Sequence, residues 1–191
     1  MAEFDFDKAV KWAKLDRPVS LSRRKSGELP FLSSAGPGAD FLLDTTVYID
    51  RLQGKLPPVV KELLEIRLSN HSTIAIAEMM HSVGRLDPLD PRTPRAIEPI
   101  GAAIKLMHPH RLFAPDADII GRAAILGGIL SRLQVYQKDD RLRAINDCVL
   151  FLQAWKLGFT VLTRNTRDFD FLLQLFPTGR VLFYRQEGPT S

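Results

Sequence analysis

The chain has little cysteine and no long hydrophobic run, and both deficits limit what it can be. A single cysteine among 191 residues excludes an internal disulfide and fits a reducing compartment. No apolar stretch approaches the roughly 18 residues that a membrane-spanning helix needs. Residues 1–7 are acidic, whereas a signal peptide begins with basic residues. We therefore expect a cytoplasmic protein with no membrane partner.

Composition indicates a folded domain without identifying its function. Hydrophobic residues make up 45% of the chain and charged residues 25%, as in ordinary globular proteins. The length fits one domain of usual size with some additional chain. The formal net charge of +4 is compatible with a polyanionic partner, but many proteins without such a partner are as basic.

Two regions can be distinguished along the chain. Residues 1–40 read as an N-terminal extension, and the main domain is expected at 41–191. Within the extension, apolar residues at i, i+3, i+4 and i+7 predict one amphipathic helix over 5–16. The basic run 23–25 and the Ser-, Gly- and Pro-rich stretch 33–38 are typical of a linker.

From residue 41 onward, short apolar strands alternate with helices. Strands are expected at 41–43, 72–74, 110–113, 159–162 and 181–184. Helices are expected from 47 onward, at 57–68, around Glu78 as far as Gly84, and at 96–107, 116–134, 142–157 and 169–175. Such alternation predicts an α/β fold with a mostly parallel sheet.

Four carboxylates stand within or directly beside apolar sequence. Asp44 ends the first strand, and Glu78 lies inside the apolar run 74–80. Asp147 precedes the apolar run 148–152, and Asp168 follows the strand 159–162 and a polar turn. An ionised carboxylate removed from water costs several kcal/mol unless something pairs with it. Because strand ends meet at one edge of a parallel sheet, we interpret these acids as a site for Mg²⁺ or Mn²⁺.

Such a site has the chemistry of a nuclease. A bound divalent ion neutralises the charge that develops when a phosphodiester is attacked, and it lowers the pKa of a bound water. Thr46, Thr163 and Asn165 are polar neighbours that could orient this water or the scissile phosphate. Arg164 and Arg167 flank the site and are candidate contacts to the phosphates of RNA.

Four blocks of sequence, at 42–50, 72–78, 146–158 and 162–169, resemble the PIN domain in order and spacing, and most closely its VapC-like toxin branch. The resemblance implies a three-layer α/β/α sandwich and a Mg²⁺- or Mn²⁺-dependent endoribonuclease, the toxin of a type II toxin–antitoxin pair. It also implies a homodimer and a small antitoxin that blocks the acidic site. The family's first three metal ligands correspond to Asp44, Glu78 and Asp147, while Asn165 and Asp168 are both candidates for the fourth.

Each acid also has a simpler interpretation. Asp44 and Asp147 could cap helices, and Glu78 could be a surface acid of an amphipathic helix. Asp168 has arginine neighbours that could serve as ordinary surface partners. Asp50 ends the first block, six residues after Asp44, and we expect it on the exposed surface of a helix.

Other functions remain open at this point. The chain could be an RNA-processing nuclease that is not a toxin, a nuclease that acts on DNA, or a non-catalytic PIN-like module that binds RNA or a protein. The extension, which departs from the compact family pattern, would regulate the site if it covered the acids. Deleting residues 1–40 would then raise activity.

Overall fold

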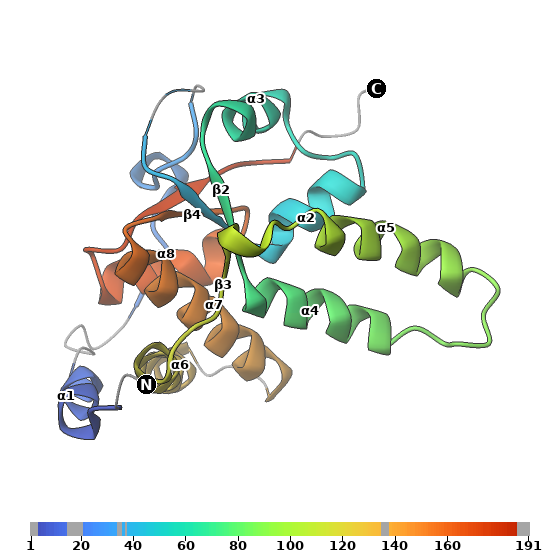
Figure 1. The fold of residues 1–191 in the computed structure, drawn as a ribbon. Helices are drawn as coiled ribbons and strands as arrows, with labels where there is room; N and C mark the ends of the chain where they lie inside the picture. Colours follow the sequence, from blue (N-terminus) through green and yellow to red (C-terminus); the bar gives the residue numbers. More distant parts are fainter. Residues whose placement is uncertain (1–3, 15–20, 34–35, 37, 135–137, 187–191) are drawn as a thin grey trace.

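The computed structural model describes residues 4–14, 21–33, 36, 38–134 and 138–186. In this part of the chain, parallel strands form one sheet in the order β3-β2-β1-β4-β5 (Figure 1). The strands are β1 Phe41–Leu43, β2 Ser69–Ser72, β3 Leu112–Phe113, β4 Thr160–Thr163 and β5 Val181–Phe183. The parallel α/β fold expected from the sequence is confirmed.

The order of the strands creates a crevice at the centre of the sheet. After β1 the chain adds β2 and β3 on one side, and it then returns to add β4 and β5 on the other. β1 and β4 are neighbours, with Leu43 opposite Leu162. Because the connections leaving β1 and β4 run in opposite directions, their carboxyl ends border the place where open parallel sheets bind ligands.

Helices cover both faces of this sheet. The helices that follow β1 are α2 Thr45–Leu52, α3 Pro58–Ile66, α4 Thr73–Gly84, α5 Thr93–Lys105, α6 Ala117–Gln134, α7 Lys138–Leu157 and α8 Thr166–Leu175. Phe41 and Leu43 of β1 pack in a hydrophobic cluster with α2, α3, α4 and α5. Leu42, whose side chain has the opposite direction, packs with α6, α7 and α8. The architecture is therefore a three-layer α/β/α sandwich. No helix of the described segments has the length and apolar character needed to cross a bilayer.

The second strand lies earlier than the sequence predicts. We expected it at 72–74, but β2 is the polar segment Ser69–Ser72. Asn70 is buried there, and its side chain donates a hydrogen bond to the carbonyl oxygen of Phe41 at 3.1 Å. The residues after it open α4, where the side chain of Ser72 caps the helix by accepting from the Ile74 amide at 3.1 Å. Pairing on both sides of β2 outweighs its low intrinsic preference for a strand.

One further strand and one helix begin at residues other than those expected. β3 contains only Leu112–Phe113, because Pro109–Arg111 forms a turn of 3-10 helix. α7 begins at Lys138, in the charged run before 142, and this places Asp147 in the middle of a helix. The interpretation of Asp147 as a helix cap is therefore wrong.

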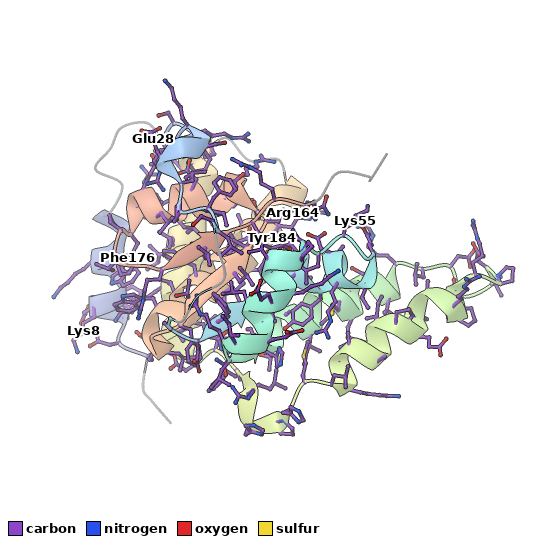
Figure 2. All side chains as sticks on the ribbon, turned by 90° about the horizontal axis from the view of Figure 1, so that it is seen from above. Lys8, Glu28, Lys55, Arg164, Phe176 and Tyr184 are labelled. Carbon is purple, nitrogen blue, oxygen red and sulfur yellow. The ribbon has the colours of Figure 1, made fainter. Side chains whose placement is uncertain are left out.

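The N-terminal extension packs against the domain. It contains α1 Phe6–Val10 and short 3-10 turns at Lys11–Lys14 and Ser26–Glu28. The helix predicted over 5–16 is thus shorter, and positions 15–16 lie outside the described residues. Figures 1 and 2 place this part of the chain on the opposite side of the molecule from the α4–α5 pair.

Aromatic and ionic contacts hold the extension there. The ring of Trp12 stacks on that of Phe176 with centroids 5.0 Å apart. Nε of Arg24 lies 2.6 Å from Oδ1 of the buried Asp170 on α8, so the basic run does more than form a solvated linker. Phe31 forms a parallel bridge with Phe183 at the edge of β5. The extension therefore contributes to the hydrophobic core and covers a sheet edge.

Candidate metal centre at the carboxyl end of the sheet

Asp44 follows β1 directly and caps α2. Oδ1 of Asp44 accepts from the Thr45 amide at 2.8 Å, and Oδ2 accepts from the hydroxyls of Thr46 and Thr163, both at 2.6 Å. The residue is only 4% exposed. Burial raises the pKa of Asp44, and the hydroxyl donors act against this rise. The carboxylate of Asp44 thus caps α2 through one oxygen and is oriented by two hydroxyl groups through the other.

Glu78, in the second turn of α4, is joined to the first block by a hydroxyl group. Thr45 donates its hydroxyl hydrogen to Oε2 of Glu78, and the side-chain amide of Asn146 donates to Oε1 at 2.9 Å. Burial raises the pKa of Glu78, and the charge of Asp44 raises it further. This half-buried glutamate is therefore not a plain surface acid. Thr45 and Asn146 were not predicted as site residues, although both lie inside the recognised blocks.

Asp147 lies at the centre of the constellation. It is 9% exposed in the middle of α7, and its Oδ2 accepts from the side-chain amide of Asn165 at 3.0 Å. Burial raises the pKa of Asp147 well above its ordinary value, and the negative charges of Asp44, Asp168 and Glu78 each raise it further. Acids separated by more than a hundred residues therefore face one region of space.

Asn165 and Asp168 complete the group at the start of α8. Asn165 is the N-cap of this helix, with Oδ1 accepting from the Asp168 amide at 3.2 Å. Its Nδ2 donates to Asp147 and to Oδ2 of Asp168, at 3.0 and 3.2 Å. Because the amide lies between two carboxylates with its oxygen engaged in the cap, the geometry favours Asn165 as an orienting group. Asp168 supplies the charge.

The donor set has the chemistry that a hard divalent cation prefers. Among the described residues, Asp44, Glu78 and Asp147 form no ion pair with a basic side chain, although the charge of Arg143 lowers the pKa of Glu78 slightly. Within the same residues no three acidic, histidine or cysteine side chains are close enough together to form a finished ligand set. Hydroxyl and amide groups separate the carboxylates. The charge of Asp44 raises the pKa of both Glu78 and Asp147, and carboxylate oxygens of this kind fit Mg²⁺ or Mn²⁺.

The flanking polar residues have different surroundings. The hydroxyl of Thr46 accepts a hydrogen bond from the Arg164 amide at 3.2 Å while it donates to Asp44. Nε of Arg164 lies 2.9 Å from Oδ2 of Asp50. Arg167 is exposed in the first turn of α8. Thr46 thus holds both the carboxylate of Asp44 and the turn after β4.

Asp50 is fully buried, so its expected position on an exposed surface is wrong. Besides Arg164, it accepts hydrogen bonds from the hydroxyl of Tyr184 at 2.8 Å and from the side-chain amide of Gln186 at 2.5 Å. Helical spacing offered the signal that was missed, because Asp50 stands one turn after the buried Val47 on the same face of α2.

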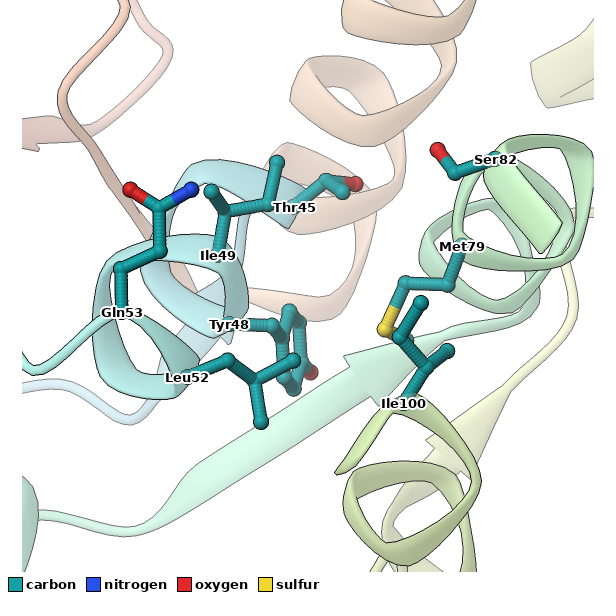
Figure 3. Close-up of a pocket in the computed structure, with 8 residues that line it drawn as sticks. All are labelled: Thr45, Tyr48, Ile49, Leu52, Gln53, Met79, Ser82 and Ile100. Carbon is teal, nitrogen blue, oxygen red and sulfur yellow. The ribbon is translucent and has the colours of Figure 1, made fainter. Parts of the chain in front are cut away.

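An apolar hollow adjoins the acidic group between α2, α4 and α5 (Figure 3). It has a volume of about 170 Å³ and is lined by Thr45, Tyr48, Ile49, Leu52, Gln53, Met79, Ser82 and Ile100. Thr45 lies on its wall, and the same residue donates to Glu78. The acidic group thus borders on a recess of mainly hydrophobic character.

Comparison with known proteins identifies the fold. No protein-family model and no curated protein sequence matches the chain. Solved structures do match, among them VapBC2 of Rickettsia felis bound to a promoter DNA fragment (TM-score 0.53, 15% identity, 76% of this chain and 98% of that one). The chain has the VapC-like PIN fold.

Two other VapBC structures agree with this assignment. The DNA-bound VapBC of Salmonella typhimurium has a TM-score of 0.52 and 17% identity over 77% of this chain and 98% of that one. VapBC-1 of nontypeable Haemophilus influenzae has a TM-score of 0.51 and 17% identity, with 76% and 96% covered. Each of these solved chains is therefore matched over nearly its whole length, whereas about a quarter of this chain lies outside each match.

Proposed function

We propose that this chain is a Mg²⁺- or Mn²⁺-dependent endoribonuclease that acts as the toxin of a type II toxin–antitoxin pair. The observation that carries the proposal is the environment of Asp147. This carboxylate is buried inside α7, and its pKa is raised by the charges of Asp44, Asp168 and Glu78. An arrangement that opposes ionisation of its own acids is explained by a cation that binds among them.

In the proposed nuclease, the acids and their polar neighbours have separate roles. Asp44, Glu78, Asp147 and Asp168 would hold the ion, which on binding stabilises negative charge on a phosphodiester and generates hydroxide from water. Thr163 and Thr46 orient the carboxylate of Asp44 through their hydroxyl groups. Asn165 bridges Asp147 and Asp168 by donating a hydrogen bond to each. Arg164 and Arg167, beside the acids in sequence, would contact substrate phosphates.

The fold and the apolar recess together support the proposed biological setting. The structures of the same fold are VapBC complexes, and the apolar hollow beside Thr45 offers a partner protein contact next to the acids. We propose a small antitoxin as this partner and a homodimer as the assembled toxin. Expression should arrest bacterial growth, and co-expression of the small open reading frame beside its gene should relieve the arrest. Harmless expression of active protein would favour an RNA-processing nuclease instead.

The direct test is cleavage of a labelled single-stranded RNA with Mn²⁺, with Mg²⁺ and with EDTA. Wild-type protein should cleave internally with either ion and not with EDTA, and Asp147→Asn should lose at least two orders of magnitude in rate. Asp87→Asn, an equal change at an exposed turn between α4 and α5, serves as the matched control. Undiminished cleavage by a folded Asp147→Asn protein would remove this residue from the mechanism.

Parallel assays separate the other functions. Cleavage of a DNA strand of the same sequence in preference to RNA would identify a DNA-directed nuclease. RNA binding without cleavage under every metal condition would leave a non-catalytic module.

A further inference from the structure

A buried acid behind the candidate metal centre joins three parts of the chain. Asp50, in the last turn of α2, is fully buried. Its Oδ2 accepts from Nε of Arg164 at 2.9 Å and from the hydroxyl of Tyr184 at 2.8 Å, and its Oδ1 accepts from Nε2 of Gln186 at 2.5 Å. One carboxylate thereby connects α2, the turn after β4 and the segment after β5.

Arg164 is consequently held at two points. Its backbone amide donates to the hydroxyl of Thr46 at 3.2 Å, and its side chain is fixed through Nε by Asp50. The residues on either side belong to the metal site, because Thr163 donates to Asp44 and Asn165 donates to Asp147. The guanidinium therefore stands at the edge of the acidic group in a defined place.

The outer part of this guanidinium remains available. Only Nε takes part in the ion pair, and neither Nη group forms a hydrogen bond with the described part of the chain. The side chain is 37% exposed. When a planar guanidinium is fixed through Nε, its remaining N–H donors point in a defined direction. These donors form a rigid pair that suits two phosphate oxygens.

The pairing of Arg164 with Asp50 also affects the acids of the candidate metal centre. A freely moving arginine at this position would be attracted to the carboxylates of the metal site and would compete with a cation. Pairing with Asp50 keeps Arg164 from competing with a cation for these carboxylates. It also keeps one positive charge beside a negative site that would otherwise repel a polyanion.

We propose that Asp50 is a positioning residue that holds Arg164 for contact with an RNA phosphate adjacent to the scissile one. The proposal rests on the function proposed above and adds a specific route by which the substrate is bound. Arg164 makes the contact, and Asp50 acts only through it.

The test is the affinity for a single-stranded oligoribonucleotide, measured in EDTA over a series of salt concentrations. Arg164→Ala should weaken binding and reduce the slope of log K against log salt by about 0.7, the value for one phosphate contact on a single strand. Asp50→Asn should weaken binding in the same way, although removing an acid would ordinarily strengthen the attraction to RNA. The double variant should bind no worse than Arg164→Ala, because both changes remove one contact.

Matched controls exclude general effects of charge and stability. Arg95→Ala also removes one positive charge, but from the exposed start of α5, and it should leave the slope unchanged. In the cleavage assay, Arg164→Ala and Asp50→Asn should raise KM with little change in kcat, since the contact is made before and during the reaction. Thermal melting identifies variants that do not fold.

If Asp50→Asn does not fold, Arg164→Lys decides the question. Lysine keeps the charge but has one cationic centre, which cannot serve Asp50 and a phosphate with separate edges, so binding should fall as in Arg164→Ala. Wild-type affinity in folded Arg164→Lys, in Arg164→Ala or in Asp50→Asn would overturn the proposal.

The results also separate this proposal from the proposed function. Metal-dependent cleavage with an unchanged KM in the variants refutes only the positioning role. RNA that is bound through Arg164 but never cleaved refutes only the nuclease. Wild-type protein that binds no RNA overturns both.

Discussion

The hydroxyl group of Thr163 donates a hydrogen bond to Oδ2 of Asp44 at 2.6 Å. The two residues stand at the carboxyl ends of β4 and β1, which are neighbours in the sheet although 119 positions separate them in the chain. This bond fixes the carboxylate at the crevice of the sheet. It also shows that a hydroxyl group on a neighbouring strand orients one of the acids.

Replacing Thr163 by valine should weaken metal binding with little change in shape. The substitution removes a donor that orients a proposed ligand, and such supporting groups commonly affect metal affinity by tenfold or more. We expect about a tenfold rise in the dissociation constant for Mn²⁺, measured by calorimetric titration. Thr160→Val, at the other end of β4, is the control and should bind Mn²⁺ like wild type. Equal affinities in the two variants would contradict the role of the Thr163 hydroxyl.

Asp147→Asn should make the metal-free protein more stable at neutral pH. A carboxyl whose pKa is raised by folding binds its proton more tightly in the folded state, so ionisation at neutral pH costs folding free energy. The amide removes this cost. A gain of about 1 kcal/mol would raise Tm by about 2–4 °C in a chain of this size. Scanning calorimetry in EDTA measures the difference, and a lower Tm for the variant would count against the inferred charge repulsion.

The way in which folding stability depends on pH can be predicted from these pKa shifts. The pKa values of Asp44, Glu78 and Asp147 are all raised, so the stabilising effect of protonation is fully present below their unfolded pKa values and is lost as pH rises through the folded ones. The difference in Tm between Asp147→Asn and wild type should therefore shrink as the pH is lowered from neutral toward 4. A difference independent of pH would show that folding does not raise the pKa of Asp147.

A bound cation should reverse the ranking of these two proteins. At a Mn²⁺ concentration one hundred times the dissociation constant, wild type should gain about 2.7 kcal/mol. Asp147→Asn should gain much less, because a ligand is missing. Binding should also release protons from the acids, which titrations in buffers of different ionisation enthalpy would measure. If both proteins gained equally, Mn²⁺ would have to bind elsewhere.

The acids of the site were predictable because their chemical type conflicts with their surroundings in the sequence. Asp44 and Glu78 are carboxylates in segments that otherwise form a core, and the strand pattern placed them at one edge of a sheet. The supporting hydrogen bonds of Thr45 and Asn146 were not predictable, because hydroxyl and amide groups are ordinary at helix ends and surfaces.

Asp50 and the extension show where local patterns fail. Asp50 shares a sequence block with Asp44, yet its partners Tyr184 and Gln186 come from the last described segment of the chain. The partners of Trp12 and Arg24 are equally distant in sequence. Long-range contacts of this kind decide whether a charged or aromatic side chain is buried, and periodicity within one segment does not contain them.

The docking of the extension leads to a last prediction, on Arg24. Its side chain pairs with Asp170, which is 2% exposed on α8 and also accepts from Gln174 at 3.1 Å. Removing the arginine leaves this buried carboxylate without its cationic partner, so Arg24→Ala should lose about 3 kcal/mol of stability. Arg23→Ala, the neighbouring exposed position, should change the free energy of unfolding by less than about 0.5 kcal/mol.

The same pair of variants examines whether the extension regulates the site. Within the described segments 4–14 and 21–33, none of the contacts involves Asp44, Glu78 or Asp147. We therefore expect that Arg24→Ala lowers the urea midpoint without raising the rate of RNA cleavage per folded molecule. Urea unfolding and cleavage are measured on the same preparations. Faster cleavage by Arg24→Ala than by Arg23→Ala would instead establish the extension as an inhibitor that acts through its docking on α8.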